Sequence, residues 1–226
     1  MSGFFVTGIG TGIGKTVSSA IIAEAIHGDY WKPVQSGNLD FTDSDFIKEY
    51  TINCPAIHSE EYVFPDPVSP FLAAKLDNKS IDVQHIRLPK TQNHIVVEGA
   101  GGLMVPLTEN LLIKDLILRL QLPVILVSMN YLGSINHTLL SIEYLKQQNI
   151  PLAGIIFNGE PNIETENYIL NYSRIRLLGK IPKADIMSKG FIIQQAEQVK
   201  KNLLSLLSEQ PAPASSNDLP IDYESF

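Results

Sequence analysis

The segment Thr7-Gly8-Ile9-Gly10-Thr11-Gly12-Ile13-Gly14-Lys15-Thr16 follows the apolar run Phe4-Phe5-Val6 and precedes a stretch of helical character that ends near Ile26. Its glycines allow the backbone to turn tightly, so that several N–H groups point into one small volume at the start of a helix. Such a volume suits a polyphosphate. Lys15 would then reach the β- and γ-phosphates, and the Thr16 hydroxyl would ligate Mg²⁺. The segment therefore predicts a phosphate-binding loop between a buried strand and a helix.

The spacing of this loop leaves other interpretations open. The usual triphosphate pattern has four residues between its first glycine and Gly-Lys-Thr, whereas five residues separate Gly8 from Gly14. The pattern Thr7-Gly8-x-x-x-Gly12-x-Gly14 also matches the dinucleotide loop of short-chain reductases. That class needs a downstream Tyr-x-x-x-Lys pair, and none of the eight tyrosines has a lysine four residues later. The Lys-Thr after the last glycine favours a nucleoside triphosphate, and a glycine-rich turn without a ligand is the remaining alternative.

Composition restricts the class of protein. The chain has 226 residues, of which 44% are hydrophobic and 18% charged, and this predicts one α/β domain over residues 1–209. Residues 210–226 are rich in Pro, Ser and acidic or amide side chains, so we expect a disordered tail there. A net charge of −7 argues against nucleic acid or an anionic membrane as partner and favours small molecules. We expect a cytoplasmic protein, because Cys54 is the single cysteine and no apolar stretch approaches the ~20 residues that cross a bilayer.

Strands and helices alternate along most of the chain. The predicted strands are residues 4–7, 30–34, 94–98, 123–129, 152–157 and 177–182. The predicted helices are residues 14–27, a helix starting near 42–45, and residues 112–120, 134–148, 163–171 and 190–209. The proline-rich segment 51–93 breaks this pattern into loops and short helices at 70–77 and 81–87, which is typical of a functional excursion. Continuous apolar strands separated by helices predict a doubly wound α/β fold, with a mostly parallel sheet covered by helices on both faces.

Oxygen ligands for a cation follow several of these elements. Thr16 lies in the loop, Asp45 lies at the start of the second helix, and Glu98 ends the strand at 94–98. A carboxylate at the tip of a core strand is costly to bury unless a cation or a donor meets it. Mg²⁺ prefers hard oxygen ligands and needs only one or two carboxylates besides phosphate oxygens, so these three residues predict a magnesium site. The neighbouring Asp43 is interpreted as a helix cap.

Two lysines complete the predicted chemistry. The strand at 30–34 delivers Lys32 and Ser36 near its carboxyl end, the edge at which open α/β sheets bind ligands. Lys32 and Lys15 would converge on the γ-phosphate and offset the charge that develops on its oxygens during transfer. The sequence therefore predicts phosphoryl transfer from ATP.

The chain resembles the ATP-dependent dethiobiotin synthetases from Phe4 to about Pro182, and in that family the five-residue loop spacing is normal. The blocks that carry the resemblance are the loop up to Lys15-Thr16, Lys32-Pro33-Val34-Gln35-Ser36-Gly37, Ser44-Asp45, Val97-Glu98-Gly99-Ala100-Gly101-Gly102, Leu132-Gly133-Ser134-Ile135-Asn136-His137-Thr138 and Leu178-Gly179-Lys180-Ile181-Pro182. The resemblance implies that 7,8-diaminononanoate and CO₂ form a carbamate, which ATP phosphorylates. The second amine then closes the ureido ring of dethiobiotin.

The resemblance also implies a set of site residues. Catalytic roles fall to Lys15, Lys32 and Thr11, and magnesium binding to Thr16, Asp45 and Glu98. ATP binding falls to Gly12, Ile13, Gly14, Lys15, Thr16, Val17, Asp45, Glu98, Gly99, Ala100, Gly101, Asn158, Gly159, Pro182, Lys183 and Ala184. Substrate binding falls to Ser36, Gly133, Ser134, Ile135, Asn136 and Tyr168. In the family the Gly133–Asn136 turn comes from the partner subunit, which implies a homodimer with the substrate site at its interface.

Two alternatives belong to different classes. A ParA- or MinD-like partition ATPase would use ATP to control its dimeric state, and such proteins carry an extra lysine in the loop where this chain has Gly10. Cobyrinate amidases would need an additional glutaminase domain, for which the chain is too short.

Overall fold

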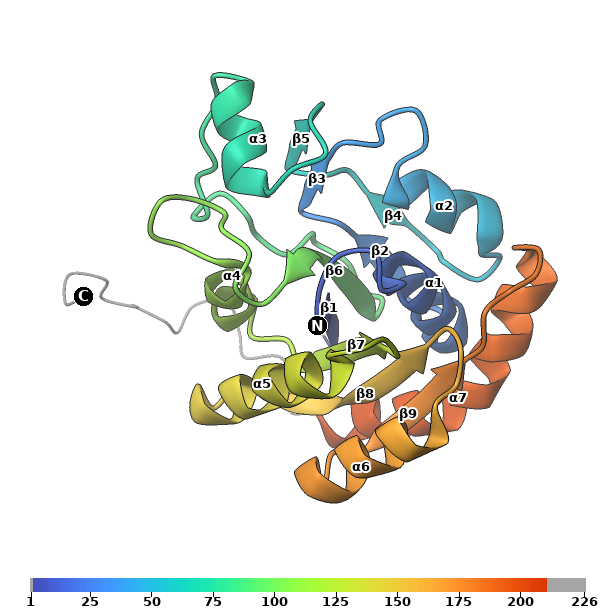
Figure 1. Ribbon diagram of the computed structural model, residues 1–226. Helices are drawn as coiled ribbons and strands as arrows, with labels where there is room; N and C mark the ends of the chain where they lie inside the picture. Colours follow the sequence, from blue (N-terminus) through green and yellow to red (C-terminus); the bar gives the residue numbers. More distant parts are fainter. Residues whose placement is uncertain (1, 211–226) are drawn as a thin grey trace.

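Seven parallel strands form the central sheet of the molecule, whose computed structural model describes residues 2–210 (Figure 1). The strands are β1 (Gly3–Gly8), β2 (Asp29–Trp31), β4 (Ile57–His58), β6 (Ile95–Gly102), β7 (Val124–Met129), β8 (Leu152–Asn158) and β9 (Leu177–Ile181). Their order in the sheet is β4-β2-β6-β1-β7-β8-β9, and every pair is parallel. The strand order reverses at β1, which has β6 on one side and β7 on the other. Ligands of open α/β sheets bind beyond the strand ends at such a point.

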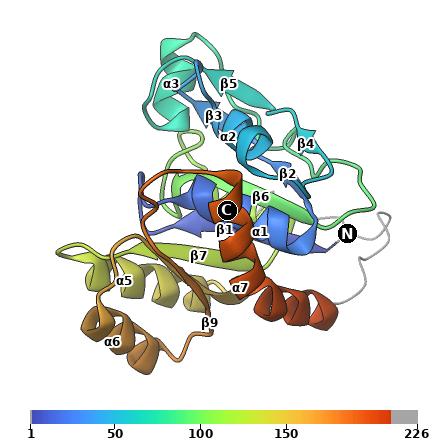
Figure 2. The ribbon, with the colours of Figure 1, turned by 90° about the vertical axis from the view of Figure 1, so that its right-hand side faces the viewer.

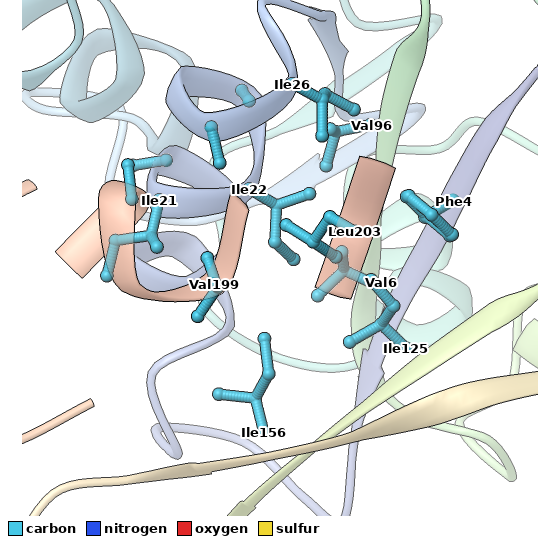
Figure 3. Close-up of a cluster of buried hydrophobic side chains, with 14 of the residues drawn as sticks. Phe4, Val6, Ile21, Ile22, Ile26, Val96, Ile125, Ile156, Val199 and Leu203 are labelled. Carbon is cyan, nitrogen blue, oxygen red and sulfur yellow. The ribbon is translucent and has the colours of Figure 1, made fainter. Parts of the chain in front are cut away.

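Helices cover both faces of this sheet (Figures 1 and 2). One face carries α1 (Lys15–Ile26), α2 (Asp43–Tyr50) and α7 (Lys189–Glu209), and the other carries α4 (Ile113–Leu120), α5 (Ser134–Gln147) and α6 (Ile163–Ser173). Figure 3 shows the core under α1 and α7, where Ile22 and Leu203 lie near Val6 of β1. The predicted doubly wound α/β class is confirmed.

Neighbouring residues of one strand serve different cores. Phe4 and Val6 of β1 pack towards α1 and α7, whereas Phe5 packs into the cluster of α4 on the opposite face. Val96 and Val97 of β6 divide in the same way. Because both faces are buried, the strands need apolar residues at every position, which is why their sequences are continuous apolar runs.

A small second sheet stands beside the main one, above it in Figure 1. It pairs β3 (Val34–Ser36) with β5 (Tyr62–Phe64) in parallel, and α3 (Pro70–Leu76) packs against it. The predicted single strand at 30–34 is therefore wrong, because the chain leaves the main sheet at Lys32-Pro33 and β3 begins after it. Proline lacks the N–H that a continuing central strand would need.

The short helix predicted at 81–87 is also wrong, since this segment forms a turn. Ile81, Val83 and Ile86 are all buried in one core cluster. Residues two apart cannot share one face of a helix, so burial of all three favours the irregular conformation. The other predicted helices and strands lie within a few residues of the observed bounds.

The described residues do not test two predictions about the chain as a whole. The predicted tail at 210–226 falls, apart from Gln210, outside the described residues, and the single domain over 1–209 stays a prediction. Within residues 2–210, no helix combines the length and the apolar character that crossing a bilayer requires.

Candidate active site

A cleft of about 640 Å³ opens at the carboxyl ends of β2 and β6 and the amino end of α1. It collects most of the residues predicted for phosphate and substrate binding. Those that line it are Thr11, Gly12, Gly14, Lys15, Thr16, Val17, Lys32, Ser36, Glu98, Ala100 and Gly101. The wall is completed by Pro67, Val68, Ser69 and Pro70, which belong to the excursion between α2 and β6.

The loop between β1 and α1 is shaped by glycine. Gly12 has φ 72° and Gly14 has φ 88°, both in the left-handed region that favours glycine. A Cβ atom on Gly14 would also lie 2.1 Å from Nδ2 of Asn158, which donates to the carbonyl of Ile13 at 3.1 Å. Among residues 2–210, no side chain caps the start of α1, so its first N–H groups remain available to a ligand. This arrangement is typical of a phosphate site.

Lys15 lies buried beside this loop. Its Nζ donates to the carbonyl of Gly10 at 2.8 Å. Burial lowers the pKa of Lys15 from 10.5 to about 8, and the attraction of Glu98 opposes this only in part. The loop therefore holds an amine that a polyphosphate would help to keep charged.

Lys32 forms a charged cluster with two carboxylates, of which Glu98 is buried and Asp43 is partly buried. Lys32 Nζ lies 2.5 Å from Asp43 Oδ2 and 3.3 Å from Glu98 Oε1. Burial disfavours the charged amine, but Glu98 and Asp43 outweigh it and raise the pKa of Lys32 above its ordinary value. Burial likewise opposes ionisation of Asp43, yet Lys32 and Thr16 hold the pKa of Asp43 below its usual range. Lys32 therefore stays positive and Asp43 negative at neutral pH.

Three side chains whose oxygen atoms could bind a cation meet in this cluster. Thr16 Oγ1 lies 2.6 Å from Asp43 Oδ1 and 3.0 Å from Glu98 Oε1. One hydroxyl and two carboxylates are hard ligands of the kind that Mg²⁺ prefers, and their number suits a cation that also binds phosphate oxygens and water. The donor set thus fits a magnesium ion.

The structure does not bring Asp45 to this cluster, contrary to the prediction from sequence. Asp45 is exposed, and its Oδ2 accepts hydrogen bonds from the backbone N and the Oγ1 of Thr42 at 3.0 and 2.7 Å. Thr42 Oγ1 in turn accepts from the backbone N of Asp45, which completes a capping box. A residue in this third position of a helix is turned back towards the cap. Asp43, interpreted as a cap from sequence, reaches the cluster instead.

Two further polar residues, one behind the cleft and one lining it, were not predicted from the sequence to have a role. Tyr30 is fully buried, and its hydroxyl donates to Glu98 Oε2 at 2.8 Å. Gln35 lines the cleft with a buried Oε1 that has no hydrogen-bond partner among the described residues. The predicted substrate residue Ser36 presents a buried Oγ in the same condition. Tyr30 and Gln35 lie in β-prone stretches where a buried side chain is expected to serve the core.

The residues predicted to read the nucleobase lie beside the cleft. Asn158, Gly159 and Pro182 line a neighbouring cavity of about 90 Å³ at the ends of β8 and β9. The hydrogen bond from Asn158 to Ile13 joins this cavity to the phosphate loop. Lys183 and Ala184 follow Pro182 but do not line the cavity.

The remaining predicted substrate residues lie away from the cleft. Gly133, with φ 101°, precedes α5, and Ser134, Ile135 and Asn136 form its first turn. Ser134 is buried, and its Oγ has no partner among the described residues. Tyr168 on α6 is 53% exposed and stacks on Tyr172. Within one chain, the structure does not bring these residues to Lys32.

Comparisons with known proteins connect this geometry to a family. A family model described as an AAA domain matches residues 2–189. The chain is 43% identical over 204 residues to the ATP-dependent dethiobiotin synthetase BioD of Christiangramia forsetii. This alignment covers 90% of this chain and 98% of that protein. It is 45% identical over 181 residues to the protein of the same name from Rhodopseudomonas palustris strain CGA009, covering 80% and 85% of the two chains.

Solved structures of other kinds of protein share the fold of this chain. A plasmid partition protein from Borrelia burgdorferi has a TM-score of 0.55 and 13% identity, covering 91% of this chain and 99% of that one. The MinC:MinD cell division complex of Aquifex aeolicus has a TM-score of 0.51 and 13% identity, covering 95% and 98%. At this identity the likeness supports the α/β fold alone.

Proposed function

The chain belongs to the family of ATP-dependent dethiobiotin synthetases, and we propose that it converts 7,8-diaminononanoate, CO₂ and ATP to dethiobiotin, ADP and phosphate. It is an ATP-dependent enzyme of biotin biosynthesis. One amine adds to CO₂ and forms a carbamate, and the terminal phosphoryl group of ATP is transferred to a carbamate oxygen. The second amine attacks the carbonyl carbon, loses its proton and expels phosphate, which closes the ureido ring. The cluster of buried Lys32 and Glu98 with the partly buried Asp43, beside the phosphate loop, is the observation that supports this chemistry best.

The two lysines would stabilise different parts of the phosphoryl transfer. Lys32 keeps its charge because of its carboxylate neighbours, and it would bind the carbamate oxygen and the γ-phosphate. Lys15 would follow the transferring phosphoryl group from the side of the loop. Fixed positive charges in a buried site stabilise the charge that develops on transferring oxygens. Thr11 and Ser36 line the same cleft and would donate to the carbamate or the diamine.

Thr16, Asp43 and Glu98 would hold Mg²⁺, with Asp43 in the role first assigned to Asp45. Magnesium bound by these residues would supply positive charge that offsets the negative charge of the phosphate groups. Asp43 supports this assignment because its carboxylate already contacts Thr16, whereas the carboxylate of Asp45 is committed to the cap of α2.

ATP would lie along the ends of the strands. The backbone of residues 12–17 would bind the phosphates, with Ala100 and Gly101 on the opposite wall. Gly99, also predicted to bind ATP, is buried beside Phe5 and would support that wall from behind. Asn158 and Gly159 would contact the base from one side, and the turn Pro182-Lys183-Ala184 from the other. The cavity beside Asn158 supports this direction for the nucleotide.

A second copy of the chain would complete the substrate site. Gly133, Ser134, Ile135 and Asn136 open a 14-residue helix whose free N–H groups suit the distant carboxylate of the diamine, and Tyr168 would close that pocket. Leu132 is fully exposed and Leu140 is 61% exposed beside this turn, as expected of residues that a partner covers. The proposed enzyme is therefore a homodimer, and its need for ATP together with a single, unpaired cysteine supports a cytoplasmic location.

One assay tests the proposed function. Purified full-length protein is incubated with the diamine, bicarbonate, Mg²⁺ and ATP, and the products are identified by mass spectrometry. We expect dethiobiotin and ADP in equal amounts, and ATP consumption that requires both the diamine and bicarbonate. ATP hydrolysis that proceeds without the diamine, with no dethiobiotin formed, would contradict the synthetase and favour the partition class.

A further inference from the structure

The hydroxyl of Tyr30 donates a hydrogen bond to the carboxylate of Glu98 from the side that faces away from the cleft. Tyr30 has no exposed surface and Glu98 is 1% exposed. The distance from Tyr30 Oη to Glu98 Oε2 is 2.8 Å, which is the normal length for a hydroxyl donating to a carboxylate. Tyr30 does not line the cleft, whereas Glu98 does. The tyrosine therefore acts on the cleft only through Glu98.

Strand geometry fixes this contact. Val96 and Glu98 are two residues apart in β6 and therefore project from the same face of that strand. Tyr30 lies within β2, and Lys32 directly follows that strand. Tyr30 is paired with Val96 in the parallel register, one step below Glu98. The Tyr30 side chain is long enough to reach Glu98 from this position, while Lys32 contacts Glu98 at the cleft.

The two oxygens of Glu98 have different partners. Oε1 contacts Thr16 Oγ1 and Lys32 Nζ at the cleft, whereas Oε2 accepts from Tyr30. A neutral donor satisfies Oε2 without cancelling the negative charge of the carboxylate, and rotation of the carboxylate would break this bond. Burial, and then the charge of Glu98, raise the pKa of Tyr30 well above its ordinary value, so the phenol keeps its proton.

We propose that Tyr30 is a positioning residue that orients Glu98, so that a single oxygen, Oε1, is presented to the divalent cation. The inference rests on the magnesium site of the proposed function. Hydrogen bonds behind a metal ligand set its orientation, and their loss commonly weakens metal affinity by about 10- to 100-fold. Loss of the Tyr30 hydroxyl should therefore lower the affinity for the divalent cation far more than the affinity for the nucleotide.

The test is Tyr30→Phe in the full-length protein with ADP bound. Mn²⁺ binding, measured by electron paramagnetic resonance, should weaken by about 10-fold or more, and the Mg²⁺ concentration for half-maximal activity should rise in proportion. ADP binding in the presence of EDTA should stay as in wild type. Because the Mn²⁺ measurement needs no diamine, it remains informative even if wild-type protein forms no dethiobiotin.

Tyr62→Phe is the matched control. The Tyr62 hydroxyl also makes hydrogen bonds, to the backbone of Asp82, but it lies away from the cleft. Tyr62→Phe should bind Mn²⁺ like wild type, and the proposal is overturned if Tyr30→Phe also does so, whether or not its thermal stability falls. If Tyr30→Phe does not fold, the hydroxyl proton of Tyr30 can be followed by NMR in labelled wild-type protein with ADP. A resonance that shifts on addition of Mg²⁺ supports the proposal, and one that does not respond rejects it.

Discussion

The two ends of the proposed substrate site differ in how completely one chain builds them. At the cation end, Lys32 and Glu98 are buried, and both contact partners of the same chain. At the carboxylate end, Leu132 and Tyr168 are exposed and the Oγ of Ser134 has no partner among residues 2–210. In the proposed enzyme, one chain would hold the groups for phosphoryl transfer in position, whereas the groups that select the substrate would need a second copy of the chain.

Removing a charge from the cation end should have the largest effect. Lys32→Met should lower kcat by about 10²- to 10³-fold, since it removes one fixed charge that stabilises the transferring group. The variant should also lose stability, because Asp43 and Glu98 would remain without their counter-ion. Turnover is therefore measured at a temperature where circular dichroism shows folded protein. Lys48→Met, on the exposed side of α2, is the control, and full turnover by Lys32→Met would rule out the role given to Lys32.

A second test separates the two aspartates of α2. Asp43→Asn should raise the Mg²⁺ requirement by about 10-fold or more, because it removes an anionic oxygen from the cation site. Asp45→Asn should behave like wild type, because an amide oxygen can still accept from the cap of the helix. Mg²⁺ titrations of both variants at saturating ATP provide the measurement. The reverse order of effects would restore Asp45 as the metal ligand.

Sequence reasoning succeeded where a motif fixes both a residue and its surroundings. The loop before α1 places Lys15 and Thr16 through local geometry alone. Glu98 was predicted as the end of a strand at 94–98, and it lines the cleft although β6 continues to Gly102. The choice between Asp43 and Asp45 depends on a capping box, which forms from side-chain contacts that a pattern of carboxylates does not determine. Sequence alone could have suggested that box, because Thr42 precedes the helix and Asp45 occupies its third position.

Other failures came from tertiary packing. Tyr30 has the character of a core residue, and only the register between β2 and β6 brings its hydroxyl to Glu98. The segment 81–87 has enough apolar residues for a helix, but the core takes Ile81, Val83 and Ile86 together. Both outcomes depend on contacts between distant parts of the chain, which hydrophobic periodicity does not encode.

At the carboxylate end, Leu140→Asp should separate the subunits of the proposed dimer. Its effect on activity should be smaller than that of Lys32→Met or Asp43→Asn. Leu140 is 61% exposed, so the fold should tolerate a charge that a dimer interface would not. Light scattering should show a monomer, and KM for the diamine should rise by about 10-fold, the usual scale of one lost set of polar contacts. ATP binding should stay unchanged. Leu204→Asp on α7 serves as control, and a monomer with an unchanged KM would mean that one chain completes the site.

The smallest expected effect comes from a change of solution pH, which titrates Lys15 at the cation end. Burial lowers the pKa of Lys15 to about 8, so the amine of the nucleotide-free protein is protonated below that pH and neutral above it. A polyphosphate binds the protonated form, and the affinity for ATP should therefore be level below pH 7 and fall by about fourfold from pH 7 to pH 8.5. Calorimetry with ATP and no diamine gives the profile without titration of the second substrate. Lys15→Arg should flatten it, because a guanidinium stays charged throughout this range. The same slope in Lys15→Arg would assign the titration to another group and weaken the view that the cation end is built within one chain.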